Sequence, residues 1–210
     1  MVLALVLFGD VIRSRSDAPA ATSWLRTLSA DLNDAYPDGT RLATFEFTQG
    51  DEIQGLLAPG SNPLTAILRA ALHPDRRKMR WVVVAGEVDP GRGPATQRSG
   101  PAFVAARARL GQAAARRERV AIVSGDPPTD DLLGGLAPLL GELLDDLTTR
   151  QRAIAWLLLV EGLRRSEAAE RLHVSRATVS VAAERAHLRS TGELARVLHV
   201  LLDRATIRVP

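Results

Sequence analysis

The chain has 210 residues, of which 46% are hydrophobic and 24% are charged, enough for one domain with an ordinary core plus a small second one. It contains no cysteine, which excludes disulfides, thiolate chemistry and cysteine-ligated zinc, and its 4 histidines show no metal-binding spacing. The net charge is only +3, but residues 148–210 hold 11 arginines against 6 acidic residues, or +5, whereas the rest holds 16 basic and 18 acidic residues, or −2. This asymmetry makes the C-terminal part the candidate for binding a polyanion.

The apolar run Val2–Phe8 predicts a first strand that is buried on both faces and ends at Gly9 and Asp10. The run is too short to cross a bilayer, and it lacks the basic flank and the cleavage site of a signal peptide. We therefore expect a cytoplasmic protein with no membrane partner. Arg13 and Arg15 follow the strand, either as a solvated connection or as contacts to phosphate.

A helix is expected next, over about residues 19–35, with an apolar face formed by Trp24, Leu25, Leu28 and Leu32. Residues 41–58 then predict a β-hairpin. In this segment β-prone, alternating residues lead to the turn pair Gly50 and Asp51, and apolar residues resume after it. The hairpin tip therefore holds an acidic residue beside a glycine, as does the end of the first strand.

These two Gly-Asp pairs predict a binding site. If their strands are neighbours in one sheet, Asp10 and Asp51 converge, while Gly9 and Gly50 allow a ligand to approach the backbone closely. Two carboxylates on rigid strands beside glycines are what a magnesium-nucleotide site requires. The structural alternative is that each Gly-Asp pair only forms a turn, which is a common role of this dipeptide.

The following elements alternate between helix and strand. They are expected over residues 64–72 (helix, after the capping segment Ser61–Pro63), 80–88 (strand), 101–117 (helix) and 119–123 (strand). The order β-α-β-β-α-β-α-β predicts an α+β fold of the ferredoxin-like or cyclase-like kind, an antiparallel sheet with helices on one face. Residues 89–99, rich in Gly, Pro and Arg, predict a surface connection, with a lid over a ligand as the alternative.

The segment Ser124–Asp131 has the composition of a linker. We therefore expect an α+β domain at residues 1–124, a linker and connecting helix at 125–147, and an all-α domain at 148–210. Pro138 is expected to open the connecting helix, because proline suits a first helical position. The leucines that follow it predict a face that docks between the domains or forms a dimer contact.

Two more motifs complete a pattern with the Gly-Asp pairs, namely Gly86-Glu87-Val88 after a strand and Gly100–Arg107 at the start of a helix. In this order the motifs resemble the catalytic domain of class III nucleotidyl cyclases, which carries two metal-binding aspartates, a Gly-Glu-Val-like strand and an Asn-x-x-x-Arg helix. The SatD family, small bacterial proteins with this domain and a helix-turn-helix behind it, is the nearer resemblance. It covers nearly the whole chain, and its most specific part is Gly50–Leu57.

The cyclase resemblance implies Asp10 and Asp51 as ligands of Mg²⁺ and Arg107 as the residue that steadies a polyphosphate. Phe103 stands where the cyclase asparagine would orient the ribose, and Phe47 stands where a base-selecting lysine often lies. Both departures replace polar groups with apolar ones, so we expect cyclisation to be absent or slow. The structural alternative for Arg107 is an ordinary charged helix face.

The last third of the chain predicts a helix-turn-helix without reference to any family. Its first helix begins with a capping box of Thr148 and Gln151, and Gly162 ends it. Ser166 is expected to cap a short second helix.

A tight turn at His173–Ser175 follows, and Ser175 caps a third helix that runs to about Leu188. His173 replaces the usual turn glycine, since histidine tolerates a positive φ better than most residues. Small alanines suit the close crossing of the two helices. The unit resembles the helix-turn-helix of the last region of sigma factors and of LuxR-type regulators.

The third helix is expected to place its N-terminal half in the major groove of double-stranded DNA. Arg176 and Thr178 are expected near base edges or flanking phosphates. The full set of predicted DNA-binding residues is Arg150, Arg152, Ser175, Arg176, Thr178, Ser180 and Arg185. The alternative is a helical hairpin that makes only protein contacts.

Ser190 and Thr191 are expected to cap a final helix with an apolar stripe formed by Leu194, Val197, Leu198, Leu201 and Leu202. The stripe suits pairing of two chains, which a homodimer on a two-fold DNA site requires, or docking on the first domain. The sequence leaves both open.

The sequence as a whole predicts a DNA-binding transcription regulator whose cyclase-like domain binds or senses a nucleotide, with Mg²⁺ as the expected ion. One alternative is a Mg²⁺-dependent nucleotidyl cyclase or nucleotidyltransferase that the helix-turn-helix regulates. Another is that the first domain is a dimerisation scaffold without a ligand.

Overall fold

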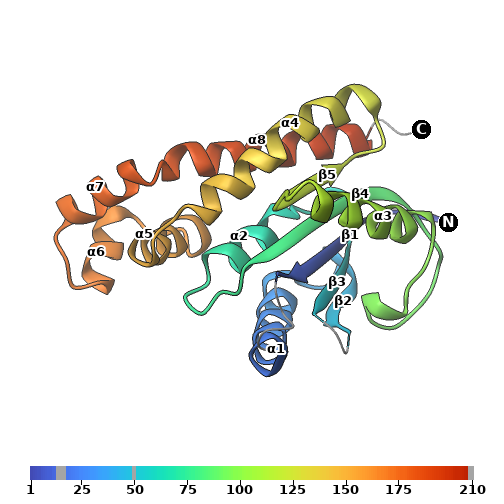
Figure 1. Ribbon diagram of the computed structural model, residues 1–210, viewed down its shortest axis with the longest axis horizontal. Helices are drawn as coiled ribbons and strands as arrows, with labels where there is room; N and C mark the ends of the chain where they lie inside the picture. The colour runs from blue at the N-terminus through green and yellow to red at the C-terminus, as the bar shows by residue number, and fades with distance from the viewer. Residues whose placement is uncertain (13–17, 49–50, 208–210) are drawn as a thin grey trace.

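The computed structural model describes residues 1–12, 18–48 and 51–207, and its fold is mixed α+β (Figure 1). Arg13, Arg15 and Gly50 lie outside these residues. Five strands form one sheet in the order β2-β3-β1-β4-β5. They are β1 (Val2–Val11), β2 (Arg41–Phe47), β3 (Glu52–Leu57), β4 (Met79–Val88) and β5 (Val120–Val123).

The helices follow the predicted order. They are α1 (Ala18–Ala35), α2 (Leu64–Leu72), α3 (Pro101–Ala115), α4 (Pro127–Asp145), α5 (Thr149–Ala155), α6 (Arg165–Arg171), α7 (Arg176–Arg185) and α8 (Leu188–Ile207). Two short segments complete them, the 3₁₀ turn η2 (Ala95–Gln97) and the π-helical η3 (Trp156–Val160) that continues α5. Among the residues described, no helix has the length and apolar character needed to cross a bilayer.

The pairing of the first four strands confirms the ferredoxin-like arrangement. β1 lies between β3 and β4 and is antiparallel to both, and β2 is antiparallel to β3. β5 departs from the predicted antiparallel sheet, since it runs parallel to β4. The reason is the helix α3 between them, which returns the chain to the end of the sheet where β4 began.

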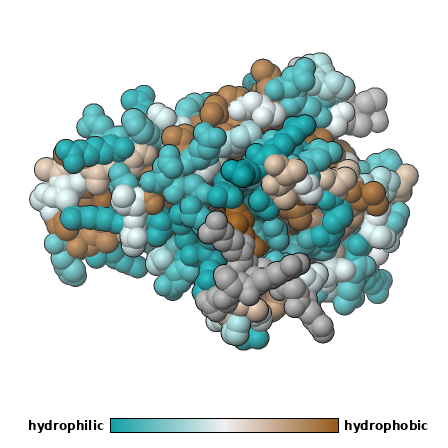
Figure 2. Space-filling model, viewed as in Figure 1, coloured by the Kyte–Doolittle hydropathy of each residue, from teal (hydrophilic) through white to brown (hydrophobic). Residues whose placement is uncertain are grey.

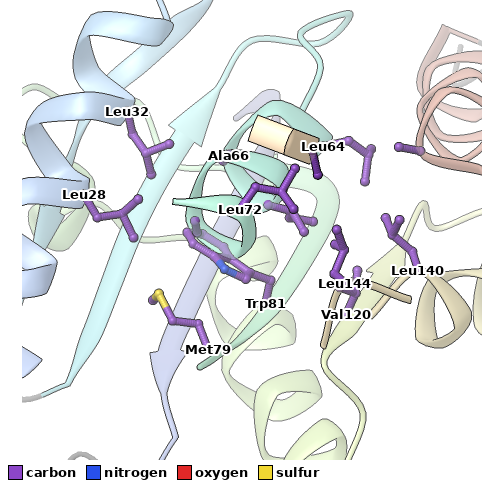
Figure 3. Packing of buried hydrophobic residues seen from close by; sticks show 14 of the residues in the cluster. Leu28, Leu32, Leu64, Ala66, Leu72, Met79, Trp81, Val120, Leu140 and Leu144 are labelled. Carbon is purple, nitrogen blue, oxygen red and sulfur yellow. The ribbon is translucent and has the colours of Figure 1, made fainter. Parts of the chain in front are cut away.

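The expectation that all helices cover one face of the sheet is wrong. Leu5 and Leu7 of β1 face a core shared with α1, α2 and α4, whose side chains point toward one another in Figure 3. Val6 and Phe8 face the other way, into a second core with α3. β1 is central and apolar on both sides, so both faces of the sheet require a cover. Hydrophilic residues cover most of the molecular face seen in Figure 2.

The segment predicted as a linker is the start of a long helix. The Asp126 side chain accepts a hydrogen bond from the Thr129 amide at 3.1 Å, and Pro127 occupies the first turn, where a missing amide hydrogen costs nothing. Pro138 therefore lies inside α4 and does not open it. Packing of α4 on β5 and α8 carries the helix through the proline.

The apolar stripe of α8 docks within the chain. Leu198 and Leu202 are buried in the same core that holds Leu140 and Leu144 of α4, and α8 also contacts α2. The stripe is therefore not available as a dimer interface. The homodimer stays a prediction.

Candidate nucleic-acid interface

The helix before the helix-turn-helix starts as predicted. The Thr148 hydroxyl accepts a hydrogen bond from the Gln151 amide, and the Gln151 side chain accepts one from the Thr148 amide at 3.0 Å, which confirms the capping box. The helix widens into η3, where the Glu161 amide donates to the Trp156 carbonyl. It ends at Gly162, whose φ of 69° is the left-handed conformation that glycine adopts most easily.

The predicted cap at Ser166 is one turn position too late. Arg164 precedes the first residue of α6, and the Glu167 carboxylate accepts a hydrogen bond from the Arg164 amide at 2.7 Å. Three residues after the cap, Glu167 takes the role that the sequence gave to a serine hydroxyl. Ser166 itself is exposed within the first turn of α6.

The turn between α6 and α7 has the expected geometry. His173 has a φ of 52°, the left-handed conformation anticipated for a residue in place of glycine. The Ser175 hydroxyl accepts from the Thr178 amide at 3.1 Å and caps α7. Val179 and Ala183 are buried where α7 crosses α6, and Ala168 and Ala169 are buried opposite them, so the small side chains allow the predicted close crossing.

The recognition helix ends earlier than predicted. α7 stops at Arg185, and α8 begins at Leu188 after His187, which has a φ of 51°. Ser190 and Thr191 therefore lie in the first turn of α8. Thr191 is buried, and its hydroxyl donates to the His187 carbonyl.

The predicted DNA-binding residues fall into two groups. Arg150, Arg176 and Arg185 are exposed, whereas Arg152, Thr178 and Ser180 are half-buried. A groove of about 520 Å³ joins the start of α5 to the outer face of α7, and it is lined by Thr148, Arg150, Gln151, Ala177, Thr178, Val181, Ala182 and Arg185. The fold thus brings Arg150 beside α7, although 26 positions separate Arg150 from Arg176 in the sequence.

Two of the predicted residues also have structural contacts. The hydroxyl groups of Ser175 and Thr178 are 2.8 Å apart at the start of α7. Arg152 donates to the Leu147 carbonyl at 3.2 Å, and burial together with the charge of Arg76 lowers the pKa of Arg152. Sequence reasoning missed the proximity of Arg76, because 75 positions separate the two arginines in the sequence.

The second predicted site lies where β1 ends and β3 begins. Arg80 donates to the Asp10 carboxylate at 3.0 Å, and the Asp51 carbonyl accepts from the Val11 amide at 2.9 Å. Burial and then the charge of Asp51 raise the pKa of Asp10 from 3.8 to about 6, although Arg80 opposes the shift. The fold therefore brings Asp10 and Asp51 near each other. Their role as metal ligands stays a prediction.

Arg107 comes from α3 to the same face of the sheet. Its guanidinium donates to both carboxylate oxygens of the buried Glu52 and lies over the Phe8 ring, 4.7 Å from the ring centroid. Gln54 also donates to Glu52 at 2.7 Å. A buried carboxylate needs such a partner, so Arg107 already has a structural task. Phe103 packs on Phe8 in the second core.

These residues do not form a metal cage in the part of the chain that is described. Carboxylates are suitable donors for Mg²⁺, but Asp10 is paired with Arg80 and Glu52 with Arg107. Within the described ranges, no group of three or more His, Asp or Glu residues could hold a metal ion. We derive no reaction step through Mg²⁺.

Gly9 has a packing role in this region. A Cβ atom at Gly9 would lie 2.9 Å from side-chain atoms of Ile53 and Trp81 on the neighbouring strands. The absence of a side chain therefore lets three strands pack closely at this point. Contact of Gly9 with a cofactor stays a prediction.

Comparison with known proteins bears on the helical part. Residues 138–188, from within α4 to the first residue of α8, match the family model described as Sigma-70, region 4. The C-terminal part of the chain contains a sigma-70 region 4 helix-turn-helix. No curated protein matches the chain significantly.

Likenesses to solved structures are distant. Two structures of a bacterial light-regulated adenylyl cyclase are 13% identical, with TM-scores of 0.38 and 0.37; the matches cover 58% of this chain and 42% and 43% of those chains. The regulator of polyketide synthase expression from Bifidobacterium adolescentis is 14% identical, with a TM-score of 0.26, over 100% of this chain and 82% of that one. The chain thus spans less than half of the cyclase chains. These likenesses carry no argument here, and the SatD resemblance stays a prediction.

Proposed function

We propose that this protein is a transcription regulator that binds double-stranded DNA through α7. The observation that carries the proposal is the sigma-70 region 4 match, which includes the whole of α6 and α7. A capped, exposed helix start with Arg176 at its first position supports it, because this is the part of a helix-turn-helix that reaches base edges.

The proposed division of roles follows from exposure. Arg176 and Thr178 lie on the first turn of α7 and contact base edges or the phosphates beside them. Arg150 and Arg185 line the groove between α5 and α7 and contact the phosphate backbone. Arg152 contributes charge from the edge of this surface. Ser175 acts mainly by holding the helix start, since its hydroxyl is already bonded to the Thr178 amide.

We also propose that the protein binds DNA as a homodimer. A single helix-turn-helix buries little surface, so useful affinity requires two copies on a pseudo-palindromic site. The α8 stripe does not provide the interface, because it is used within the chain. Light scattering of the free protein and of its DNA complex measures the number of chains in each.

The test of DNA binding starts with selection of a target from a random duplex pool, followed by fluorescence anisotropy at several salt concentrations. Arg176→Ala is expected to cost ~1–3 kcal/mol at one position of the site, and Arg150→Ala is expected to flatten the salt dependence by about one unit of slope. Arg204→Ala, which removes an exposed arginine near the end of α8, is the control and should change neither. If no sequence is enriched and Arg176→Ala leaves even non-specific binding unchanged, the module is a protein-contact hairpin.

A second function is proposed for the sheet, namely binding of a nucleotide with Mg²⁺ near Asp10, Asp51 and Arg107. It is supported by the mutual repulsion of the two aspartates, which a cation between them would relieve. The site must displace Arg80 and Glu52 from their present partners. Thermal-shift measurements with each nucleoside triphosphate and Mg²⁺ test the idea, and Asp51→Asn should abolish any stabilisation. Asp51-dependent release of a cyclic product or of pyrophosphate would instead identify an enzyme.

A further inference from the structure

A basic groove lies on the sheet-containing part of the molecule. Its volume is about 1040 Å³, and its lining is formed by Ile12, Pro74, Asp75, Arg76, Arg77, Lys78, Arg80, Arg117 and Arg119. Six of these nine residues are basic and one is acidic. The groove is unexpected from the sequence, because the first 147 residues carry more acidic than basic side chains.

The acidic partners do not cancel this charge. Arg76, Lys78 and Arg119 share one carboxylate, that of Asp145, at 3.2, 3.4 and 2.6 Å. Arg80 is paired with Asp10. Six cations thus face Asp10, Asp75 and Asp145, which leaves an excess of three positive charges. Lys78 has a side chain that is 53% exposed, and Arg117 is exposed as well.

The Asp145 contacts hold the groove in shape. Burial raises the pKa of Asp145, but the hydrogen bond from Arg119 and the charges of Arg119, Lys78 and Arg76 lower it further, so this carboxyl is ionised at neutral pH. Asp145 is the last residue of α4. It therefore ties the loop between α2 and β4, together with the start of β5, to the helix that leads into the helix-turn-helix.

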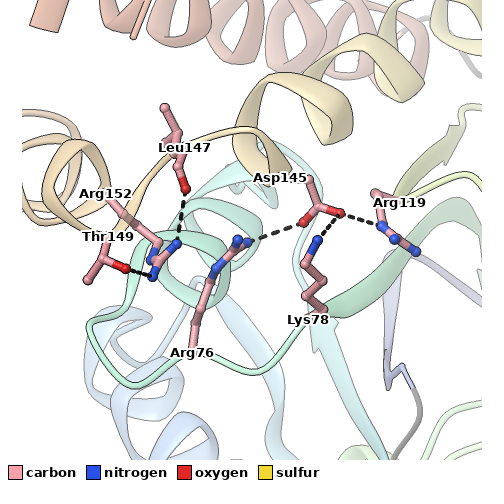
Figure 4. Close-up of polar contacts among 7 residues, drawn as sticks. All are labelled: Arg76, Lys78, Arg119, Asp145, Leu147, Thr149 and Arg152. Carbon is pink, nitrogen blue, oxygen red and sulfur yellow. Dashed lines mark hydrogen bonds and ion pairs between the residues drawn. The ribbon is translucent and has the colours of Figure 1, made fainter. Parts of the chain in front are cut away.

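The groove continues toward the proposed DNA-binding surface. Figure 4 shows Arg152, Arg76, Lys78 and Arg119 in succession, from α5 to the start of β5. Arg76 is close enough for its charge to act on Arg152, and Arg152 donates to Thr149 in the first turn of α5. The adjacent Arg150 lines the groove beside α7. A row of cations therefore leads from α7 into the sheet-containing part.

We propose that this basic groove binds the phosphate backbone of the DNA duplex flanking the segment that α7 enters. The inference rests on the proposed function and extends it, since it makes the sheet-containing part a second DNA contact. A phosphate backbone is a long, regular polyanion, and a row of cations that continues from a helix-turn-helix matches it better than an isolated anion does. The contact adds affinity without sequence preference, because phosphates carry no base identity.

The test compares two full-length double variants. Lys78→Gln with Arg117→Gln removes two exposed cations of the groove. Arg26→Gln with Arg92→Gln removes two exposed arginines from α1 and from the loop after β4, as the control. Anisotropy is measured on the selected site trimmed to its minimum and on the same site extended by about 10 base pairs at each end.

The groove variant is expected to lose about 1.8 units of salt slope on the extended duplex, from about 0.9 per phosphate contact, and nothing on the trimmed one. The control pair should match the wild type on both. Hydroxyl-radical footprinting of the wild-type complex should show protection beyond the site of α7, which does not depend on any variant folding.

Other outcomes overturn the inference in distinguishable ways. If wild type binds duplex DNA but the groove variant behaves as the control and the footprint ends at the α7 site, the groove makes no DNA contact and the proposed function stands. If inorganic tripolyphosphate stabilises wild type but not the groove variant, while flanking DNA adds no affinity, the groove is a small-anion site. If wild type binds no duplex at all, both proposals fail.

Discussion

The indole ring of Trp156, in η3, lies edge-on to the imidazole ring of His73 at the end of α2, with ring centroids 5.5 Å apart. The guanidinium of Arg69 stands over the same indole at 5.5 Å, and the indole nitrogen donates to Glu161 at 2.7 Å. His73 in turn packs on Trp24 of α1. These rings join the helix-turn-helix to the helices that cover the sheet.

Trp156→Ala is expected to lower the free energy of unfolding of the whole chain by about 2 kcal/mol. Complete burial would give about 3–5 kcal/mol, and Trp156 is only half-buried. Urea denaturation followed by circular dichroism measures the effect. Val181→Ala, on the exposed face of α7, is the control and should change stability by under about 0.5 kcal/mol. An equally small change for Trp156→Ala would show that the ring contacts do not hold the parts together.

His173→Gly is expected to stabilise the protein by roughly 1 kcal/mol. The residue has a φ of 52°, and a Cβ atom is unfavourable in that conformation whereas glycine adopts it freely. His173→Ala keeps the Cβ atom and should bring no such gain, which makes it the matched control. Equal stability of the two variants in thermal and urea denaturation would mean that contacts of the imidazole offset the backbone strain.

Asp10→Asn is expected to remove part of the pH dependence of stability between about pH 4 and 6. The folded-state pKa of Asp10 is raised from 3.8 to about 6, so the folded protein binds this proton more tightly than the unfolded chain. Asp10 therefore contributes stability at low pH that is lost as the pH rises through 6. Because the side chain is partly exposed, the change is on the order of 1–2 kcal/mol.

Denaturation midpoints of wild type, Asp10→Asn and the control Asp131→Asn, measured at several pH values, decide this point. Asp131 is exposed on α4, away from the sheet. A wild-type profile between pH 4 and 6 that Asp10→Asn leaves unchanged would contradict the assignment of the raised pKa to Asp10.

Gly9→Ala is expected to destabilise the fold by about 1–3 kcal/mol, because the new methyl group would press on Ile53 and Trp81. Gly111→Ala is a matched control, since the added methyl group on α3 meets nothing within 4 Å and should stabilise the helix by up to about 1 kcal/mol. If Gly9→Ala keeps full stability but loses nucleotide-dependent stabilisation, the glycine serves ligand approach and not packing.

Much of the secondary structure follows from the sequence alone, because local interactions decide it. The apolar periodicity of α1, the hairpin of β2 and β3, and the capping box at Thr148 depend on residues close to one another in the chain. The positive φ at His173 follows from its place in a tight turn. The same local signals place α7 and its arginines, and hence the proposed DNA-binding surface.

Only the tertiary structure decided the rest, because it depends on contacts between distant segments. Whether α3 shares a face with α1, whether Pro138 opens or interrupts a helix, and where the α8 stripe docks are settled by packing, which no local pattern encodes. The pairing of Arg107 with Glu52 requires α3 to lie over β3. Likewise, the cations at 76–80 and 117–119 belong to a part of the chain with a net negative sequence charge, and they form one groove because β4 and β5 lie side by side.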